Sequence, residues 1–319
     1  MGPSSSRISE LVSLRHEECS LIYDSITSKL DSQRRKLLRY SRATYLNMHS
    51  DSQNIYDDPN FFTAYGTLKR SQQGLAGAPE WPSIRQMILG SSNDSLPQSR
   101  VLDLGCGYGW FVRWARENGA SYVKGVDISE KMIEKAKSFD TDAKIVATRE
   151  ICYEEHDLER IMLDEDPDCG SYDLVYSSLT FHYIEDLGRL FRQIHSSLKR
   201  GNKSVKGKLV FSVEHPIYSA PVQPAADWID VKTAGGESQA WPLNSYSMEG
   251  LRVTSWLGTD GVRKYHRTTE TYVSLLLENE FVLTGLKDWA PSDEDIAANP
   301  EWSVERHRPF FLLLAAEIR

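Results

Sequence analysis

A glycine-rich turn and a later carboxylate are the residues of this 319-residue sequence whose types and spacing best suit chemistry. Gly105, Gly107 and Gly109 follow the largely apolar run 101–104 and precede a helical pattern. Glycine lets the backbone approach a ligand with no Cβ in the way, and Asp127 can accept hydrogen bonds from both hydroxyls of a ribose. The combination predicts an adenosine pocket. The alternative is a tight turn in which the glycines serve only helix packing.

The spacing of these glycines also distinguishes between nucleotides. A dinucleotide motif G-x-G-x-x-G that starts at Gly105 needs glycine at position 110. This chain has Trp110 there, so the pattern disfavours NAD as the ligand.

Alternating strand and helix signals begin near residue 100, and these elements must position the turn. Strands are expected at 100–104, 122–127, about 151–156, 172–177 and 207–214. Helices are expected between them at 110–118, 130–139 and 186–198, the second capped by Ser129. This order is typical of a parallel sheet with helices on both faces. A further helix at 268–280 and two strands at 281–289 and 310–318, with no helix between them, predict an antiparallel pair at the sheet edge.

The rest of the chain predicts additions to this core. Residues 1–50 carry apolar side chains at helical intervals, which predicts an N-terminal helical extension that packs on the body or on a second subunit of a homodimer. Residues 51–99 are aromatic and turn-prone, as in a lid. Residues 100–319 form the main domain, and its segment at about 215–267 is expected to be an inserted cap of short antiparallel pieces, with a hairpin turn at Thr259-Asp260-Gly261.

The composition and charge of the chain limit the kinds of partner that it is expected to bind. The chain is 40% hydrophobic and 26% charged, with a formal net charge of −8. With a pI near 5.6 and no dense Lys/Arg run, it is not expected to bind nucleic acid, so a small molecule is the expected substrate. No apolar run approaches the roughly 18 residues of a membrane span, and the start lacks a signal-like apolar stretch, which predicts a cytoplasmic protein without membrane attachment. The four cysteines have no C-x-x-C spacing, so neither zinc nor any other metal site is expected.

Over about residues 50 to 319 the sequence resembles the class I S-adenosylmethionine-dependent methyltransferases. The run 101–110 is similar to their first motif, 125–127 to their ribose-binding acid and 172–178 to the strand before the reaction centre. Other residues resemble a subgroup of these enzymes that methylates small molecules and is similar to methyltransferase types 11 and 25. These residues are Tyr56, Tyr65, Arg70-Ser71, Gly74-Leu75, Glu80-Trp81-Pro82, 177–183 and 211–217. The resemblance implies an α/β fold with a Rossmann-like, seven-stranded, mostly parallel sheet that has one antiparallel edge strand.

The resemblance also implies a cofactor, S-adenosyl-L-methionine, and residues that bind it. Asp103 would orient the turn, and Asp157 would hold the adenine amino group, with Glu155 as a less favoured choice and a solvated helix start as the alternative. Tyr56, Tyr65 and Arg70 would close over the cofactor, and Arg70 would pair with its carboxylate. In the alternative, the tyrosines fill the core beneath the N-terminal helices and Arg70 lies on a solvated face. The implied cofactor contacts are Tyr56, Tyr65, Arg70, Asp103, Gly105, Gly107, Asp127, Ile128, Asp157, Leu158 and Ser177.

Three residues at the ends of the fourth and fifth strands are candidates for catalysis. His182, Glu214 and His215 are expected to converge above the methyl group and to take a proton from the acceptor. In the alternative, His215 braces the cap and Glu214 binds a backbone amide. Arg306 or Arg308 would hold an acidic substrate if it faces inward.

The expected function is methyl transfer to O, N or C of a small-molecule metabolite, in secondary metabolism. Two alternatives remain open at this point. One is a protein that binds the cofactor without methylating, as a cyclase or pericyclase-like enzyme or as an interaction scaffold. The other is methylation of a protein partner, which would need an open acidic groove.

Overall fold

The computed structural model describes residues 52–90, 95–140, 150–201, 206–223, 225–233 and 236–319. All of them except Ser52 belong to one compact unit, Gln53–Arg319. The predicted helical extension at 1–50, and any dimer contact through it, lie outside the described residues.

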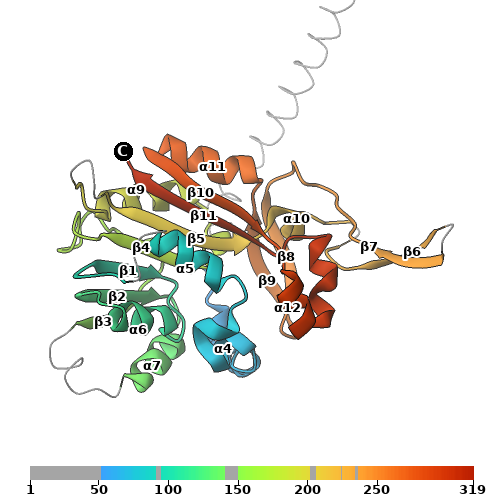
Figure 1. The fold of residues 1–319 in the computed structure, drawn as a ribbon, viewed down its shortest axis with the longest axis horizontal. Coiled ribbons are helices and arrows are strands. Elements are labelled where there is room, and N and C mark those ends of the chain that lie inside the picture. Colours follow the sequence, from blue (N-terminus) through green and yellow to red (C-terminus); the bar gives the residue numbers. More distant parts are fainter. Residues whose placement is uncertain (1–51, 91–94, 141–149, 202–205, 224, 234–235) are drawn as a thin grey trace, which may run out of the picture. The chain divides into compact units, whose positions relative to one another are not determined.

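A seven-stranded sheet forms the centre of this unit, in the order β10-β11-β5-β4-β1-β2-β3 (Figure 1). Its strands are β1 (Arg100–Leu104), β2 (Tyr122–Asp127), β3 (Ile151–Glu155), β4 (Leu174–Ser178), β5 (Lys208–Glu214), β10 (Phe281–Trp289) and β11 (Phe311–Ile318). β11 runs antiparallel to both of its neighbours, and all the other pairs are parallel. The predicted fold class is confirmed.

The reversed strand differs from the prediction in its place. β11 lies between β5 and β10, so the edge of the sheet is β10. The helix before β10 carries the chain across the sheet, so β10 runs in the same direction as β5 but one position further out, and the last strand returns into the gap.

Helices cover both faces of the sheet (Figure 1). They are α3 (Pro59–Tyr65), α4 (Lys69–Gln73), α5 (Trp81–Leu89), α6 (Trp110–Glu117), α7 (Glu130–Phe139), α9 (Leu187–Ser197), α10 (Pro216–Ser219), α11 (Thr269–Glu278) and α12 (Asp293–Ala298), with 3-10 turns η1 (Ile55–Asp57), η2 (Gly74–Gly77), η3 (Phe181–Tyr183) and η4 (Pro300–Arg306). α9 and α11 bury Phe191 and Leu276 on one face. α5, α6 and α7 bury Ile84, Val112 and Ile133 on the other.

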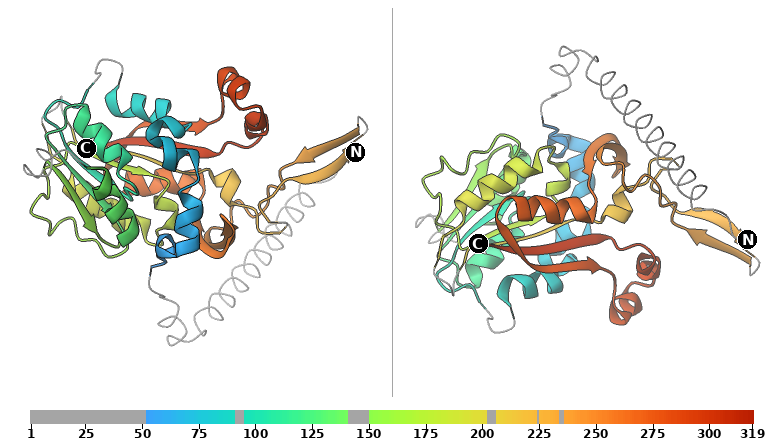
Figure 2. Two further views of the ribbon diagram at one scale, coloured as in Figure 1. Left: turned by 90° about the horizontal axis from the view of Figure 1, so that it is seen from below. Right: turned by 90° about the horizontal axis from the view of Figure 1, so that it is seen from above.

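The segment at about 215–267 contains α10 and two antiparallel hairpins, while its role as a cap stays a prediction. β6 (Ile229–Thr233) pairs with β7 (Gly236–Ala240), and β8 (Gly250–Trp256) pairs with β9 (Thr259–His266). Figure 2 shows the first hairpin projecting away from the sheet. The second hairpin does not turn at Thr259-Asp260-Gly261, which lies within β9. It turns at Leu257 and Gly258, whose φ angles of 51° and 74° are both positive, as a two-residue hairpin turn prefers.

None of the helices formed by the described residues is long and apolar enough to cross a membrane. The same residues include no group of three or more His, Cys, Asp or Glu side chains placed to hold a metal ion.

Candidate functional site

The glycine turn joins β1 to α6, and its three glycines serve two different purposes. Their φ angles are 81° at Gly105, 51° at Gly107 and 70° at Gly109. A Cβ on Gly105 would lie 2.1 Å from Thr180 Oγ1, and one on Gly109 would lie 2.4 Å from the Tyr153 hydroxyl oxygen. Among the described residues, a Cβ on Gly107 would meet only the Tyr65 hydroxyl oxygen, at 3.9 Å. Neighbouring side chains therefore occupy the space at the outer two glycines, whereas Gly107 faces open space that a ligand can enter.

Asp127 ends β2 beside this open position. Its Oδ2 accepts a hydrogen bond from the Gly107 backbone N–H at 2.8 Å, and its Oδ1 accepts one from the Ser129 N–H at 3.0 Å. Burial raises the pKa of Asp127 to about 6, although these backbone donors favour the ionised form. Each carboxylate oxygen has a second lone pair, so the group can also accept from two hydroxyls of a ligand.

Asn54 adds an acceptor that sequence reasoning missed. Its Nδ2 donates to Asp57 Oδ2 at 2.6 Å and to the Ile128 carbonyl at 3.1 Å. Its Oδ1 is buried and accepts no hydrogen bond from the described residues. Such an atom favours a ligand that brings a donor. With the Asp127 carboxylate, it makes a set of acceptors beside the open position at Gly107, which fits the hydroxyl and amino donors of an adenosine group.

Tyrosines of the lid segment lie next to the open glycine. Tyr65, whose hydroxyl lies nearest to Gly107, packs edge-on against Tyr56, with ring centroids 5.4 Å apart. The Tyr56 hydroxyl lies 3.3 Å from that of Tyr183 in η3. Burial raises the pKa of Tyr56 and Tyr65, so these hydroxyls stay neutral. Tyr65 and Tyr56 thus link the glycine turn to η3, which follows β4, while their contact with a cofactor and the lid role of this segment stay predictions.

Arg70 lies in a partly buried ion pair. Its Nη2 donates to both carboxylate oxygens of Glu80, at 2.9 and 3.1 Å, and Glu80 is only 2% exposed. The solvated position considered for Arg70 is therefore wrong. Its predicted pairing with a cofactor carboxylate is not tested by these contacts.

The other predicted cofactor residues have contacts within the protein. Asp103 is buried in β1, and burial together with Asp127 raises its pKa. Ser177 Oγ donates to the Leu104 carbonyl at 2.6 Å, which ties β4 to β1. Asp157 follows β3 and accepts from the Glu159 N–H at 2.9 Å, while Leu158 lies in the core. Their roles toward a cofactor stay predictions.

The three catalytic candidates do not converge. His215 is turned away from the other two: its Nδ1 accepts from the Ile217 N–H at 3.1 Å, and its Nε2 lies 2.9 Å from Asp288 Oδ1 in β10. The ring is held at both nitrogens and ties the start of α10 to β10, so His215 does not join His182 and Glu214 as expected. His182 and Glu214 do lie together, because the Glu214 backbone N–H points at His182 Nδ1 at 3.4 Å.

These two residues differ in charge. Burial lowers the pKa of His182 to about 4, so the ring is neutral at pH 7. Burial acts against ionisation of Glu214 too, yet the Lys264 ammonium holds the pKa of this carboxyl below its usual value. The site therefore contains a carboxylate that stays ionised beside a neutral imidazole.

Lys264 is the second functional candidate that sequence reasoning missed. It is 6% exposed, and its Nζ lies 2.5 Å from Glu214 Oε1. The ammonium also faces the rings of Trp256 and Tyr183, at 5.1 and 5.9 Å from their centroids. Lys264 shares the buried face of β9 with Val262 and His266, so two-residue periodicity in this strand was a signal that could have found it.

Arg308 faces inward, as a role in holding an acid requires. It is 5% exposed and lies 4.2 and 4.6 Å from the ring centroids of Trp241 and Tyr218. Its Nη2, however, donates to both oxygens of Glu305 at 2.6 and 2.7 Å. The charge of Arg308 is thus already neutralised, and Arg306 pairs on the surface with Asp293.

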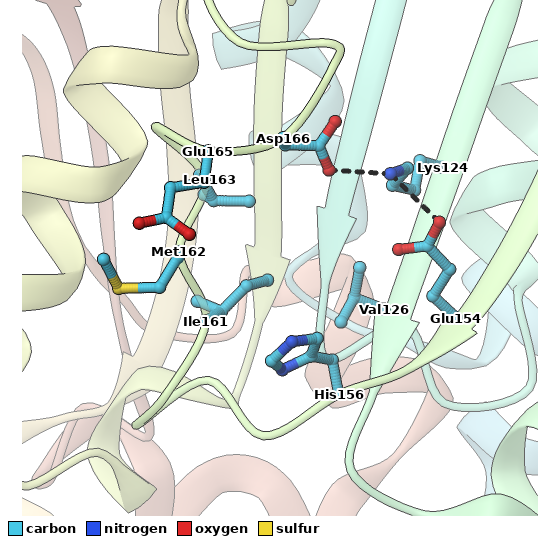
Figure 3. A pocket seen from close by; sticks show the side chains of 9 residues that line it. All are labelled: Lys124, Val126, Glu154, His156, Ile161, Met162, Leu163, Glu165 and Asp166. Atoms are coloured by element: carbon cyan, nitrogen blue, oxygen red, sulfur yellow. Dashed lines mark hydrogen bonds and ion pairs between the residues drawn. The ribbon is translucent and has the colours of Figure 1, made fainter.

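A separate cavity of about 310 Å³ lies between β2, the end of β3 and the loop before β4 (Figure 3). Lys124 in its wall pairs with Asp166 at 2.8 Å and with Glu154 at 3.1 Å. The residues that line it are Lys124, Val126, Glu154, His156, Ile161, Met162, Leu163, Glu165 and Asp166, none of which was a predicted site residue.

Comparison with known proteins identifies the family to which this chain belongs. A model described as a methyltransferase domain matches residues 102–205. An uncharacterized protein of Haemophilus influenzae is 31% identical over 267 residues, which cover 82% of this chain and 96% of that protein.

Two solved structures are similar to this chain over nearly their whole lengths. An S-adenosylmethionine dependent methyltransferase from Mesorhizobium loti is 42% identical, with a TM-score of 0.65, and the match covers 76% of this chain and 100% of that one. A structure from Listeria monocytogenes, provisionally assigned to the same class, is 35% identical with a TM-score of 0.63, over 77% of this chain and 99% of that one. Since this likeness extends far beyond the glycine turn, the chain belongs to the S-adenosylmethionine-dependent methyltransferases.

Proposed function

We propose that this protein transfers the methyl group of S-adenosylmethionine to O, N or C of a small-molecule metabolite held beneath the cap, in secondary metabolism and in the cytoplasm. One observation carries the proposal. Gly107 faces open space beside Tyr65, and a continuous set of side chains leads from there through Tyr56 and Tyr183 to the largely buried Glu214. Cofactor and acceptor would thus share one water-poor pocket.

The residues divide into a cofactor side and an acceptor side. On the cofactor side, Asp127 would accept from the ribose hydroxyls while Asn54 Oδ1 accepts a further donor of the nucleoside. Gly105 shapes the turn and Gly107 lets it close on the methionine part, with Arg70 as partner of the carboxylate. Asp157 would bind the adenine amino group; Asp103, Ile128, Leu158 and Ser177 complete the proposed set.

The bound sulfonium supplies a methyl group that needs no metal for its transfer. The protein then has to align the acceptor, exclude water and receive a proton where the acceptor loses one. We assign the last task to Glu214, because it is ionised and its Oε2 accepts no hydrogen bond from the described residues. Where the acceptor loses a proton on methylation, Glu214 would receive it.

Turnover is the test. Incubation with S-adenosylmethionine labelled in its methyl group, together with a fractionated extract of small metabolites, should yield S-adenosylhomocysteine and a labelled product detected by mass spectrometry. Glu214→Gln should keep the affinity for S-adenosylhomocysteine and lose turnover. Binding without turnover on any fraction would favour the non-methylating alternative, and absence of binding would exclude the proposed pocket.

Asp127 predicts how cofactor binding depends on pH. Ribose hydroxyls donate to the ionised carboxylate, so binding favours loss of the proton from a group whose pKa in the free protein is about 6. Affinity for S-adenosylhomocysteine should be constant above about pH 7 and should fall as the pH drops through 6, by at most about tenfold per pH unit. Titration calorimetry checks this, and Asp127→Asn should flatten the curve. An affinity that rises on acidification would contradict the assignment.

A further inference from the structure

Buried charges on the acceptor side of the pocket do not balance. Lys264 and Arg267 are 6% and 8% exposed, and Lys264 pairs with Glu214, whose side chain is 14% exposed. All three act on the neighbouring ring of His182: Glu214 favours its charged form, whereas Lys264 and Arg267 oppose it. His182 itself is neutral at pH 7, so it adds no charge to the group.

Arg267 has no counter-ion of its own. Its Nη2 donates to the carbonyl oxygens of Ile184 and Glu185, at 2.6 and 2.7 Å. It forms no ion pair with any carboxylate of the described residues. Glu214 can neutralise only one of the two cations, so this side of the pocket keeps an excess of one positive charge.

Such an excess is costly in a site of low dielectric constant, because each buried ion has lost its hydration. A bound sulfonium would add a second positive charge nearby. A cationic acceptor would increase the cost further, a neutral one would leave it, and an anionic one would reduce it. The charge balance therefore favours an anion.

Lys264 is the residue placed to receive that anion. One of its three N–H groups is taken by Glu214, while the ammonium otherwise faces the rings of Trp256 and Tyr183. These rings also offer flat apolar walls next to the charge. We infer that the methyl acceptor carries an oxyanion, a carboxylate in the simplest case, on a flat apolar body, and that Lys264 binds this group. The inference rests on the proposed function, since it concerns the acceptor of that same site.

Binding of the anion would also act on Glu214. An oxyanion at Lys264 Nζ takes over part of the attraction that now keeps Glu214 ionised. The remaining effect of burial favours the protonated carboxyl. Glu214 therefore takes up a proton more readily when the methyl acceptor is bound. Proton transfer would thus be coupled to recognition of the substrate charge.

Matched probes test the inference in the complex with S-adenosylhomocysteine. Each probe set has one scaffold, benzene, naphthalene or indole, that carries a carboxylate, a primary amide or an aminomethyl group. Titration calorimetry should show the carboxylate member of at least one set binding about tenfold or more tightly than its amide, with no binding of the amine. Lys264→Met should remove this preference, and Lys264→Arg should keep most of it.

Two further variants separate charge recognition from damage to the fold. Glu214→Gln removes the group that competes for Lys264, so it should tighten carboxylate binding, whereas a merely structural pair would show no gain. Lys232→Met, on the exposed surface of β6 in the same cap, should change nothing.

The outcomes are distinct. The inference is overturned if no carboxylate binds the complex, if amides bind equally well, or if Lys264→Met keeps the preference while still binding S-adenosylhomocysteine. Failure of the wild-type protein to bind S-adenosylhomocysteine would instead overturn the proposed function.

Discussion

Replacing Asp127 with alanine should weaken binding of S-adenosylhomocysteine by about 1–3 kcal/mol, which is the usual cost of leaving buried polar groups unpaired. Two effects add in the same direction. The ribose hydroxyls lose their acceptor, and the N–H groups of Gly107 and Ser129, now held at 2.8 and 3.0 Å, lose theirs as well. The turn next to the ligand is therefore less well fixed.

Titration calorimetry at about pH 7.5 measures this loss, since Asp127 is then ionised in the free protein. Asp166→Ala is the matched control: it also removes a carboxylate that is ion-paired near the sheet, but in the separate cavity beside Lys124. The control should leave the affinity unchanged. Equal affinities of the wild type and Asp127→Ala would show that this carboxylate does not hold the nucleoside.

Local signals in the sequence predicted the part of the site that the sheet positions. β1 and β2 occupy the expected residues 100–104 and 122–127, because a short apolar run between turn signals specifies a buried strand. The same motif placed Gly109 directly before the expected helix, and the structure has Gly109 in a left-handed conformation at the start of α6. The place of β11 was not predictable in this way, since strand order within a sheet depends on contacts that no local pattern encodes.

On the acceptor side, the spacing of residues in the sequence was not enough to predict which side chains lie together. Glu214 and His215 are adjacent in the chain, yet only Glu214 lies beside His182, because His215 caps α10 immediately before Pro216. Lys264 comes from a hairpin fifty residues further on, and its burial appears only when that hairpin folds over the end of β5. Functional residues carried by an insertion depend on tertiary packing rather than on a local motif.

The glycine turn offers the sharpest comparison, because two neighbouring alanine substitutions should fail in different ways. Gly105→Ala should destabilise the fold: a left-handed residue other than glycine costs about 1–3 kcal/mol, and its Cβ would lie 2.1 Å from Thr180 Oγ1. The overlap adds about 1–3 kcal/mol more. Thermal or urea unfolding of the free protein measures the sum.

Gly107→Ala should destabilise the free protein less than Gly105→Ala does. Its Cβ would have an ordinary contact at 3.9 Å, so only the left-handed backbone opposes it, at about 1–2 kcal/mol. Its affinity for S-adenosylhomocysteine should nevertheless fall at least tenfold, since the new methyl group occupies space that the ligand needs. Thus Gly105→Ala lowers mainly the free energy of unfolding, whereas Gly107→Ala lowers mainly the affinity for S-adenosylhomocysteine.

A double variant shows whether the cause at Gly105 is the contact with Thr180. The three atoms nearest to a Cβ at Gly105 all belong to the Thr180 side chain, so Thr180→Gly should cost less in the Gly105→Ala background than in the wild type. No such substitution should rescue binding by Gly107→Ala, because the space there is left for a ligand rather than filled by a side chain. If Gly107→Ala binds S-adenosylhomocysteine as tightly as the wild type, the turn contributes only packing, and the cofactor must lie elsewhere along the ends of the strands.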